Sequence, residues 1–296
     1  MTTGPSGSWA AVVVNYEAGP LLLDCVQSLL ADTSAGAAPD VVVVDNGSRD
    51  GSVATLRAAV PSVHIVDAGT NLGYAAAANR GIAATEAAVV AVCNPDAKVE
   101  PGTARALIDR LETEPDLGAV GPAVFEPDGS RYPSARQVPS TGDAVAHALL
   151  GKAWPRNPFT RRYRELDADP DQPREVDWVS GAAVWLRRSA LDTIDGWDER
   201  YFMYVEDVDL CWRLRQAGWR IGYEPGGTVV HIKGASTDRH PYRMIAAHHR
   251  SLLRFAARRW RGWRRVLLVP AALFLGLRAA ASALARAVDP RARSRG

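Results

Sequence analysis

The sequence predicts an α/β protein with an open, doubly wound, mostly parallel sheet, followed by a helical extension that is basic and amphipathic. The sheet is predicted because short β-branched runs alternate with helical stretches between residues 9 and 93, and polar residues follow each run. The extension is predicted because twelve arginines and one acid lie between residues 250 and 296, whereas the whole 296-residue chain nets +2. An acidic body therefore carries a basic tail.

The first half of the chain alternates regularly between strand and helix patterns. The opening run WAAVVVN (9–15) has the unbroken apolar composition of a strand that is buried on both faces, as a parallel sheet requires. The pattern then predicts helices over about 19–31, 51–59 and 74–84, and strands over 41–44, 63–66 and 88–93. In such a βαβ order, ligands bind beyond the carboxyl ends of the strands.

The second half is less regular. The proline-rich segment 127–173 shows little periodicity, so we expect an insertion or long loop over the active site. Order resumes at 176–179, and further elements are expected as strands at 182–186, 219–224 and 228–232 and as helices at 206–217 and 242–260.

Polar residues gather where the predicted strands of the first half end. They are Asn15-Tyr16, Asp45-Asn46, the segment 71–74 and Asn94-Pro95-Asp96. Asn, Asp and Gly favour turns for steric reasons, so ordinary turn chemistry could explain any one of these groups. Four groups at one edge of the same sheet favour a crevice suited to a nucleotide.

Three acids stand at the start of the predicted helix 206–217: Glu206, Asp207 and Asp209. They could cap the helix, bind a metal or take a proton. By i, i+3, i+4 spacing, Asp207 shares a face with the apolar stripe, whereas Asp209 is expected on a wetter face, paired with Arg213. A carboxylate at the wall of a cleft suits a general base.

The extension raises the question of a membrane. The apolar run 266–277 ends at Arg278, short of the ~20 residues that span a bilayer. Arginines interleaved with Phe255, Trp260 and Trp263 favour a helix in the headgroup region of an anionic leaflet. A solvated basic helix and a nucleic-acid-binding tail are the alternatives, but no nucleic-acid-binding motif accompanies the tail, so we expect no nucleic acid partner.

The compartment is predicted from the cysteines and the N-terminus. Cys25, Cys93 and Cys211 are widely spaced and odd in number, which favours free buried thiols in a reducing compartment. The start MTTGPSGSWA has no charged and apolar signal regions, so we expect no signal peptide.

Five segments together resemble family 2 inverting glycosyltransferases of the Rossmann-like GT-A fold, especially the rhamnosyltransferase branch. They are VVVVDNGSRDGS (41–52), NLGYAAAANRGI (71–82), CNPDA (93–97), SGAAVWLRRSALDTIDGWDERYFMYVEDVDLCWRLRQAG (180–218) and VVHIKGAST (229–237). Three more stretches, 128–140, 151–165 and 244–251, look like the members that build the actinobacterial cell-wall arabinogalactan linker. The resemblance implies transfer of L-rhamnose from dTDP-β-L-rhamnose to a polyprenyl-diphosphate-linked N-acetylglucosamine. A family 2 transferase with another nucleotide sugar or acceptor is the alternative.

The resemblance also implies a division of the chain. Residues 1–237 would form the GT-A domain, with a nucleotide-sugar half at 1–126, the insertion at 127–175 and an acceptor and catalytic half at 176–237. Residues 238–296 would form the membrane-associating extension, so the enzyme would be peripheral on the cytoplasmic face of the membrane. An oligomer is compatible with the sequence.

On the donor side, the resemblance implies that Asp45 contacts the nucleoside beside Asn15 and Tyr16. The wall of the base and ribose would be shaped by Asn71, Gly73, Tyr74 and Asn79. Asp96 matches the last acid of the family's DxD motif, while Asn94 replaces the first acid and removes one carboxylate.

The resemblance further implies that His231 joins Asp96 in holding Mg²⁺ or Mn²⁺ and that Asp207 is the catalytic base with Glu206 as its neighbour. For the acceptor, Trp178 offers an apolar face beside Ser180 and Gly181, although a core tryptophan is an equal alternative. The lipid diphosphate could meet cationic side chains, namely Arg131, Arg136, His248, His249 and Arg250.

Two other classes of protein could share parts of this pattern. A sugar-nucleotide pyrophosphorylase would need a Gly-rich loop with Arg and Lys after the first strand, where Asn15, Tyr16 and Glu17 stand instead. A non-catalytic carbohydrate-binding or membrane-scaffold protein would explain the tryptophans and the tail, but it would not need Asp96, Asp207 and His231 together.

Overall fold

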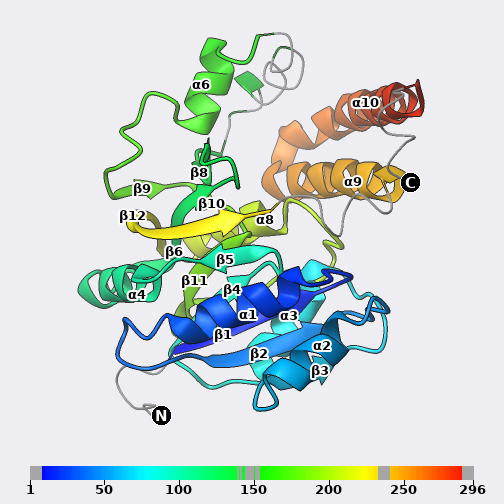
Figure 1. Ribbon diagram of the computed structural model, residues 1–296. Helices are drawn as coiled ribbons and strands as arrows, with labels where there is room; N and C mark the ends of the chain where they lie inside the picture. The colour runs from blue at the N-terminus through cyan, green and yellow to red at the C-terminus, as the bar shows by residue number, and fades with distance from the viewer. Residues whose placement is uncertain are drawn as a thin grey trace.

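A ten-stranded sheet forms the centre of the fold (Figure 1). The computed structural model describes residues 9–138, 140, 142–143, 150, 154–232 and 241–288. The strands are β1 (Trp9–Asn15), β2 (Asp40–Asp45), β3 (His64–Asp67), β4 (Val89–Cys93), β5 (Ala97–Val99), β6 (Leu117–Phe125), β7 (Arg131–Tyr132), β8 (Ala135–Arg136), β9 (Arg174–Val176), β10 (Trp178–Val179), β11 (Ala183–Arg187) and β12 (Arg220–His231). The helices are α1 (Leu21–Ala31), α2 (Ser52–Ala59), α3 (Tyr74–Ala83), α4 (Thr103–Thr113), α6 (Pro158–Arg164), α7 (Arg188–Asp192), α8 (Glu206–Gln216), α9 (Pro241–Arg259), the 3₁₀ turn η2 (Gly262–Leu267) and α10 (Leu268–Val288).

The first half of the sheet is parallel, as the sequence predicts. The order of the main sheet is β3-β2-β1-β4-β11-β6-β12-β5, and β1 pairs in parallel with both β2 and β4. All seven residues of β1 are buried, which is the burial expected of a strand covered on both faces. The carboxyl ends of β1, β2 and β4 therefore meet at one edge.

The second half is mixed. β11 runs antiparallel to both of its neighbours, β4 and β6, whereas β12 pairs in parallel with β6. The two strands expected at 219–224 and 228–232 are one strand, β12, whose pairing with β6 shifts register between Glu224 and Thr228. Proline and two glycines at 225–227 interrupt the ladder there without ending the strand.

Helices cover both faces of the sheet and enclose two apolar cores. α1, α2 and α4 pack on one face, and α3, α7 and α8 pack on the other (Figure 1). Contact is closest at Gly81 of α3, where an added Cβ would lie 2.3 Å from Cγ1 of Val12. Cys25, Cys93 and Cys211 are buried free thiols, which agrees with the expectation.

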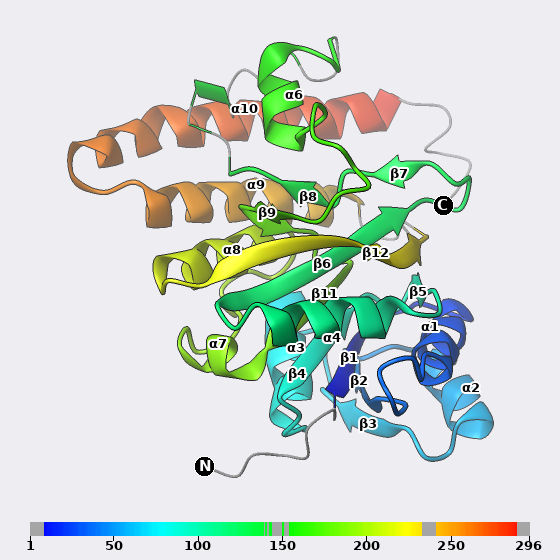
Figure 2. The same ribbon diagram turned by 90° about the vertical axis from the view of Figure 1, so that its left-hand side faces the viewer.

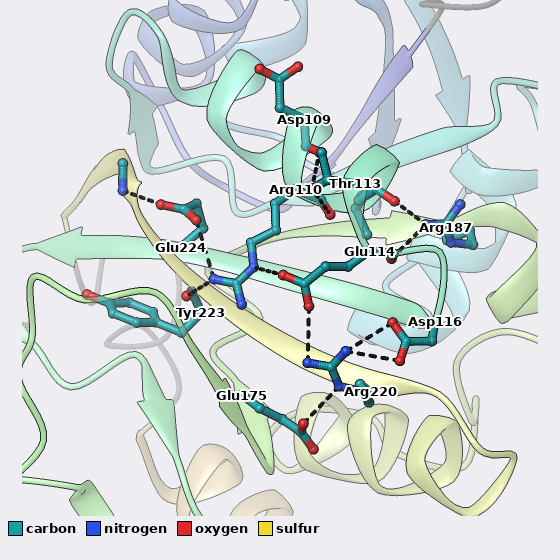
Figure 3. A network of polar contacts seen from close by, with 12 residues as sticks. Asp109, Arg110, Thr113, Glu114, Asp116, Glu175, Arg187, Arg220, Tyr223 and Glu224 are labelled. Atoms are coloured by element: carbon teal, nitrogen blue, oxygen red, sulfur yellow. Dashed lines mark hydrogen bonds and ion pairs between the residues drawn. The ribbon is translucent and has the colours of Figure 1, made fainter.

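A polar network ties α4 to the start of β12, at the opposite end of this strand from His231 (Figure 3). Arg220 pairs with Glu114 at 3.1 Å, Asp116 at 3.0 Å and Glu175 at 2.8 Å. Arg110 donates to the carbonyl oxygen of Tyr223 at 2.8 Å. These groups brace the sheet away from its carboxyl edge.

The proline-rich segment is more ordered than the expected loop. It contains β7, β8 and the short helix α6, and β9 follows it directly; β8 pairs with β10 in a separate two-stranded sheet. α6 begins because Oδ1 of Asn157 accepts a 2.9 Å hydrogen bond from the amide of Thr160, with Pro158 at the first helical position. The helix was missed because seven residues carry too little periodicity to be recognised.

The C-terminal extension is a helical hairpin that docks on the domain. Figure 2 shows α10 lying along α9, and α9 along α8. The ring of Phe255 in α9 meets that of Trp212 in α8 edge to face at 6.2 Å, and Ser251 donates to the carbonyl oxygen of Met203 at 3.0 Å.

The apolar stretch of the extension is longer than the run 266–277 that the sequence predicted. The helical stretch Gly262–Ala287 has 26 residues and contains an 18-residue window with mean hydropathy 1.9, so by length and composition it could cross a membrane. The expectation that Arg278 ends it was wrong, because α10 continues through seven apolar or small residues beyond this single charge. Length and composition alone do not separate a spanning helix from one lying in the interface.

Candidate functional site

Two connected cavities open at the carboxyl edge of the parallel strands. The smaller, of about 380 Å³, is lined in part by polar residues that follow β1, β2, β3 and β4: Tyr16, Asn46, Asn71, Asn94 and Asp96. The larger, of about 830 Å³, extends from this edge to α9 and α10. Both are lined by Tyr74, Asn94, Tyr132, Ser180, Met203, Tyr204 and His231.

Asp207 lies in the first turn of α8 and lines the larger cavity. Its Oδ2 accepts a 2.9 Å hydrogen bond from the Gly181 amide, and its Oδ1 accepts a 2.8 Å bond from the Val208 amide. Burial raises the pKa of Asp207, and these two amides act in the opposite direction. The result is a fixed, partly desolvated carboxylate with a raised proton affinity.

The turn before α8 is strained. Tyr204 and Val205 have φ of 68° and 69°, a left-handed conformation that is rare for any residue with a side chain and rarest for a β-branched one such as Val205. Val205 is also buried and lines the larger cavity. This backbone directs the first turn of α8 at the cavity.

Glu206 is a buried carboxyl group beside Asp207. It is 8% exposed, and its Oε2 has no hydrogen-bond partner among the described residues. Burial and the neighbouring Asp207 carboxylate raise the pKa of Glu206 to about 8. At neutral pH this raised pKa favours the protonated form of Glu206 beside Asp207.

Asp209 pairs with Arg213 at 2.8 Å, as predicted, but it does not lie on a wet face. Its side chain is fully buried and also contacts the Tyr201 hydroxyl at 3.0 Å and Nε of Arg258 in α9 at 3.2 Å. The spacing within α8 identified Arg213 but could not identify partners from distant segments.

The proposed metal ligands lie together in the smaller cavity. Nε2 of His231 is 3.0 Å from Oδ1 of Asp96 and 3.2 Å from Nδ2 of Asn94. Two adjacent ligands of an octahedral ion with bonds of ~2.1 Å stand ~3 Å apart, so Asp96 and His231 fit such an ion. The described residues include no cluster of three or more His, Cys, Asp or Glu side chains, so water and donor phosphate oxygens would complete the shell.

The residues predicted to contact the nucleoside divide into supporting and lining groups. Nδ2 of Asn15 lies 3.0–3.1 Å from its acceptors on Asp45, Ser48 and Ser52, and neither Asn15 nor Asp45 lines either of these two cavities. Asn46 is the lining residue after β2, and its Oδ1 accepts a 2.9 Å bond from the Leu72 amide. Asn15 and Asp45 thus hold the loop that positions Asn46.

The predicted wall of the base and ribose is partly assembled. Asn71, Gly73 and Tyr74 line the smaller cavity, and an added Cβ at Gly73 would lie 2.5 Å from the Phe202 carbonyl oxygen. Asn79 is placed elsewhere, since its amide exchanges hydrogen bonds of 2.9 Å with the backbone of Trp197. Asn79 braces a loop instead of lining either cavity.

Arg136 is the predicted acceptor residue that the structure places best. It lines the larger cavity and donates to the carbonyl of Pro133 at 2.7 Å and to the hydroxyl groups of Tyr132 at 2.6 Å and Tyr163 at 3.2 Å. Its guanidinium lies 4.9 Å from the ring of Trp178, whose indole N–H donates to the Gln137 carbonyl. Trp178 is 5% exposed and acts mainly as a stacking surface for Arg136.

The other predicted cationic residues are less favourably placed. Arg131 pairs with Asp171 at 2.8 Å, Arg250 is exposed and His249 is buried, and none of them lines either of these two cavities. His248 does line the larger cavity, but burial, His249 and Arg278 lower its pKa to about 4. A neutral His248 offers no positive charge to a phosphate.

Several residues that line the cavities were not predicted from the sequence. Tyr132 and Tyr204 line both cavities, and Arg259 and Arg278 line the larger one. Arg278 had been interpreted as the end of an apolar run. Its helical spacing from Ala271 and Phe274 was visible in the sequence, but only the docking of α10 shows which face meets the cavity.

The chain matches known proteins over most of its length. Residues 10–194 match the family profile described as Glycosyl transferase family 2. The chain is 44% identical over 268 residues to the N-acetylglucosaminyl-diphospho-decaprenol L-rhamnosyltransferase of Mycobacterium tuberculosis. The aligned region covers 87% of this chain and 86% of that protein.

Solved structures support the fold. The chain is similar to GalNAc-T7 with UDP, GalNAc and Mn²⁺ at a TM-score of 0.58 and 13% identity, over 79% of this chain and 47% of the other. It is also similar to the mannosyltransferase PcManGT from Pyrobaculum calidifontis with GDP-Man and Mn²⁺ at a TM-score of 0.54 and 19% identity, over 97% and 82%. These similarities confirm the predicted Rossmann-like GT-A architecture.

Proposed function

Because this chain belongs to glycosyl transferase family 2, we propose that it transfers L-rhamnose from dTDP-β-L-rhamnose to a polyprenyl-diphosphate-linked N-acetylglucosamine, in building the cell-wall linker. The observation that carries the proposal is the position of Asp207, a carboxyl group held by the Gly181 and Val208 amides in the wall of a cavity that joins the crevice at the strand ends. The 44% identity to a transferase named for a decaprenol-linked sugar supports this acceptor class.

The reaction is a single displacement that inverts the anomeric carbon. Asp207 takes the proton of the acceptor hydroxyl as its oxygen forms a bond to C1 of rhamnose. The bond from C1 to the phosphate oxygen breaks, and its electron pair leaves with dTDP. A β-linked donor therefore gives an α-rhamnoside.

The protein residues that serve the donor lie in the smaller cavity. Asn46, Asn71 and Tyr74 line the part that would hold the nucleoside. Asp96 and His231 would hold Mg²⁺ or Mn²⁺, which neutralises charge on the departing diphosphate when bound.

The surface of the extension supports membrane association. Arg261, Arg264 and Arg265 are exposed, as are Trp263 at 73% and Leu277 at 73%. Arginine beside exposed tryptophan and leucine suits the interface of an anionic leaflet. The enzyme would therefore be peripheral on the cytoplasmic face, where a polyprenol-bound acceptor is held.

The test is a donor panel with a short-chain lipid-linked N-acetylglucosamine as acceptor and with Mg²⁺ or Mn²⁺ present. We expect transfer from dTDP-rhamnose and an α-linkage in the product, determined by NMR. Asp207→Asn should lower kcat by about 10²- to 10⁴-fold with the affinity for dTDP unchanged, because Asp207 does not line the smaller cavity. Faster transfer from another nucleotide sugar would overturn the donor assignment, and a near-normal rate for Asp207→Asn would overturn the base.

A further inference from the structure

We infer that the first isoprene units of the polyprenyl diphosphate lie in the larger cavity, between the hairpin of α9 and α10 and the catalytic domain. This inference rests on the proposed function and assigns the helical extension to substrate binding in addition to membrane association. The hairpin would thereby hold the lipid end of the acceptor while Asp207 receives the sugar end.

The helical spacing of the lining residues supports this assignment. Besides His248 of α9 and Pro270 of α10, two sets of residues line the cavity: Leu252, Phe255, Ala256 and Arg259 in α9, and Ala271, Phe274, Leu275 and Arg278 in α10. Each set follows the i, i+3, i+4, i+7 spacing of one helix face, with three apolar positions and then an arginine. Two apolar stripes that border one cavity leave a channel suited to an extended, methyl-branched isoprenoid chain.

The channel is continuous with the catalytic residues. The same cavity is lined at its other end by Ser180, Gly181 and Asp207. Its volume of about 830 Å³ is within the ~300–1,000 Å³ that holds ligands of drug size. One ligand can thus place an apolar chain at the hairpin and a sugar hydroxyl at Asp207.

The charges match a diphosphate between these two ends. Guanidinium groups of Arg136, Arg259 and Arg278 line the cavity from three separate elements. Arg136 is held by the hydroxyl groups of Tyr132 and Tyr163, so its position does not depend on a ligand. Guanidinium forks suit phosphate oxygens in geometry and charge. An apolar chain joined to a diphosphate combines the two features of this lining.

The outer face of α10 is a separate surface. Val269, Leu273 and Leu277 are 68%, 66% and 73% exposed and do not line the cavity. α10 is therefore apolar on two faces, of which the outer suits the membrane and the inner the isoprenoid. The inner residues Ala271, Phe274 and Leu275 are half-buried and border the cavity.

The first experiment compares two adjacent alanines of α10. Ala271→Trp places an indole in the channel, whereas Ala272→Trp places the same group on the exposed side of the same helix. Farnesyl diphosphate is titrated into each full-length variant. We expect Ala271→Trp to weaken binding by at least about tenfold and Ala272→Trp to leave it at the wild-type level. Equal affinities in all three proteins would overturn the inference.

The second experiment uses acceptor chain length. N-acetylglucosamine is linked through a diphosphate to citronellyl or farnesyl chains, and the ratio of the two KM values is measured. The wild type should prefer the longer chain, and Ala256→Trp in α9 should remove this preference while Ala257→Trp, exposed on the same helix, retains it. A chain-length preference that persists in Ala256→Trp would overturn the inference.

The outcomes separate this inference from the proposed function. If no rhamnose is transferred to any acceptor but Ala271→Trp still loses farnesyl diphosphate, the reaction is wrong and the channel stands. If rhamnose is transferred but Ala271→Trp and Ala256→Trp both keep the wild-type chain-length preference, the reaction stands and the channel is wrong. Displacement of farnesyl diphosphate by dioleoyl phosphatidic acid at equal concentration would show a general lipid site and overturn the choice of isoprenoid.

Discussion

The backbone amide of Gly181 holds Oδ2 of Asp207 at 2.9 Å. The carbonyl group of Gly181 in turn accepts a 2.9 Å hydrogen bond from the hydroxyl of Tyr74 in α3. The Gly181 peptide, anchored by Tyr74, therefore orients the carboxylate of Asp207 from the side of the cavity. A carboxylate that is held by backbone groups loses little freedom when it receives a proton.

Gly181 gives the first prediction. A Cβ at this position would lie 3.2 Å from Cβ of Asp207 and 3.5 Å from its Oδ2, so Gly181→Ala should displace the carboxylate by a few tenths of an ångström. We expect kcat to fall by about tenfold or more, with KM for the nucleotide sugar retained. Gly276→Ala is the control, since its Cβ meets nothing within 4 Å. Equal rates for the two variants would contradict the positioning role.

Glu206 gives a prediction about stability and pH. Its pKa is about 8 in the folded protein and 4.5 when unperturbed. Between these values the unfolded chain loses a proton that the folded protein retains, so wild-type stability falls as pH rises from about 4.5 to about 8. Glu206→Gln removes this loss and should gain on the order of a few kcal/mol relative to wild type across this window.

Denaturant unfolding at several pH values measures this gain. Glu86→Gln, on the exposed surface, is the control and should follow the wild-type curve. A difference between Glu206→Gln and wild type that stays constant with pH would show that the Glu206 carboxyl group titrates normally.

Asn94 gives a prediction about the metal. It stands at the first position of the acidic motif, and its side-chain amide lies 3.2 Å from Nε2 of His231. Asn94→Asp would add a carboxylate beside Asp96, so the concentration of Mn²⁺ that gives half-maximal binding should fall by about tenfold. Electron paramagnetic resonance of free Mn²⁺ measures this binding without turnover. His231→Ala should shift the midpoint in the opposite direction, and midpoints equal to wild type in both variants would exclude these side chains as ligands.

Asp209 gives a prediction about docking of the hairpin. It is fully buried, and its removal leaves Arg213 without its 2.8 Å partner and Arg258 without its contact to α8. Asp209→Ala should therefore cost about 3–5 kcal/mol of unfolding free energy. Asp109→Ala removes an exposed i, i+4 partner of Arg105 and should cost less than about 1 kcal/mol. Similar losses for the two variants would mean that the Asp209 pair contributes no more than a surface pair.

The exposed arginines of η2 and its flank give the last prediction. Neutralising Arg261, Arg264 and Arg265 together to Gln should weaken binding to anionic liposomes by about 100-fold, at ~1 kcal/mol for each charge. Binding of the wild type should also fall as salt rises. Liposome flotation measures both effects, with Arg105→Gln, exposed on α4, as the control. Unchanged flotation of the triple variant would show that these charges do not contact the membrane.

Local patterns predicted much of the fold correctly. The runs at β1 and β2 identify buried parallel strands because β-branched residues without polar alternation fit only a strand covered on both faces. The helix α6 was missed, and β12 was divided in two, because short helices and irregular pairing leave weak periodic signals.

The sequence by itself determined the parallel half of the sheet, the polar groups at its carboxyl edge and the orientation of Asp207 toward the apolar side of α8. These properties depend on the 2.0- and 3.6-residue periods of the chain, which are local. Only the tertiary structure decided that Asp209 is buried against Arg258, that Asn46 rather than Asp45 lines the cavity, and that Arg278 faces inward. Those outcomes depend on contacts between segments far apart in the chain, and no local period records which distant surface a helix or loop will meet.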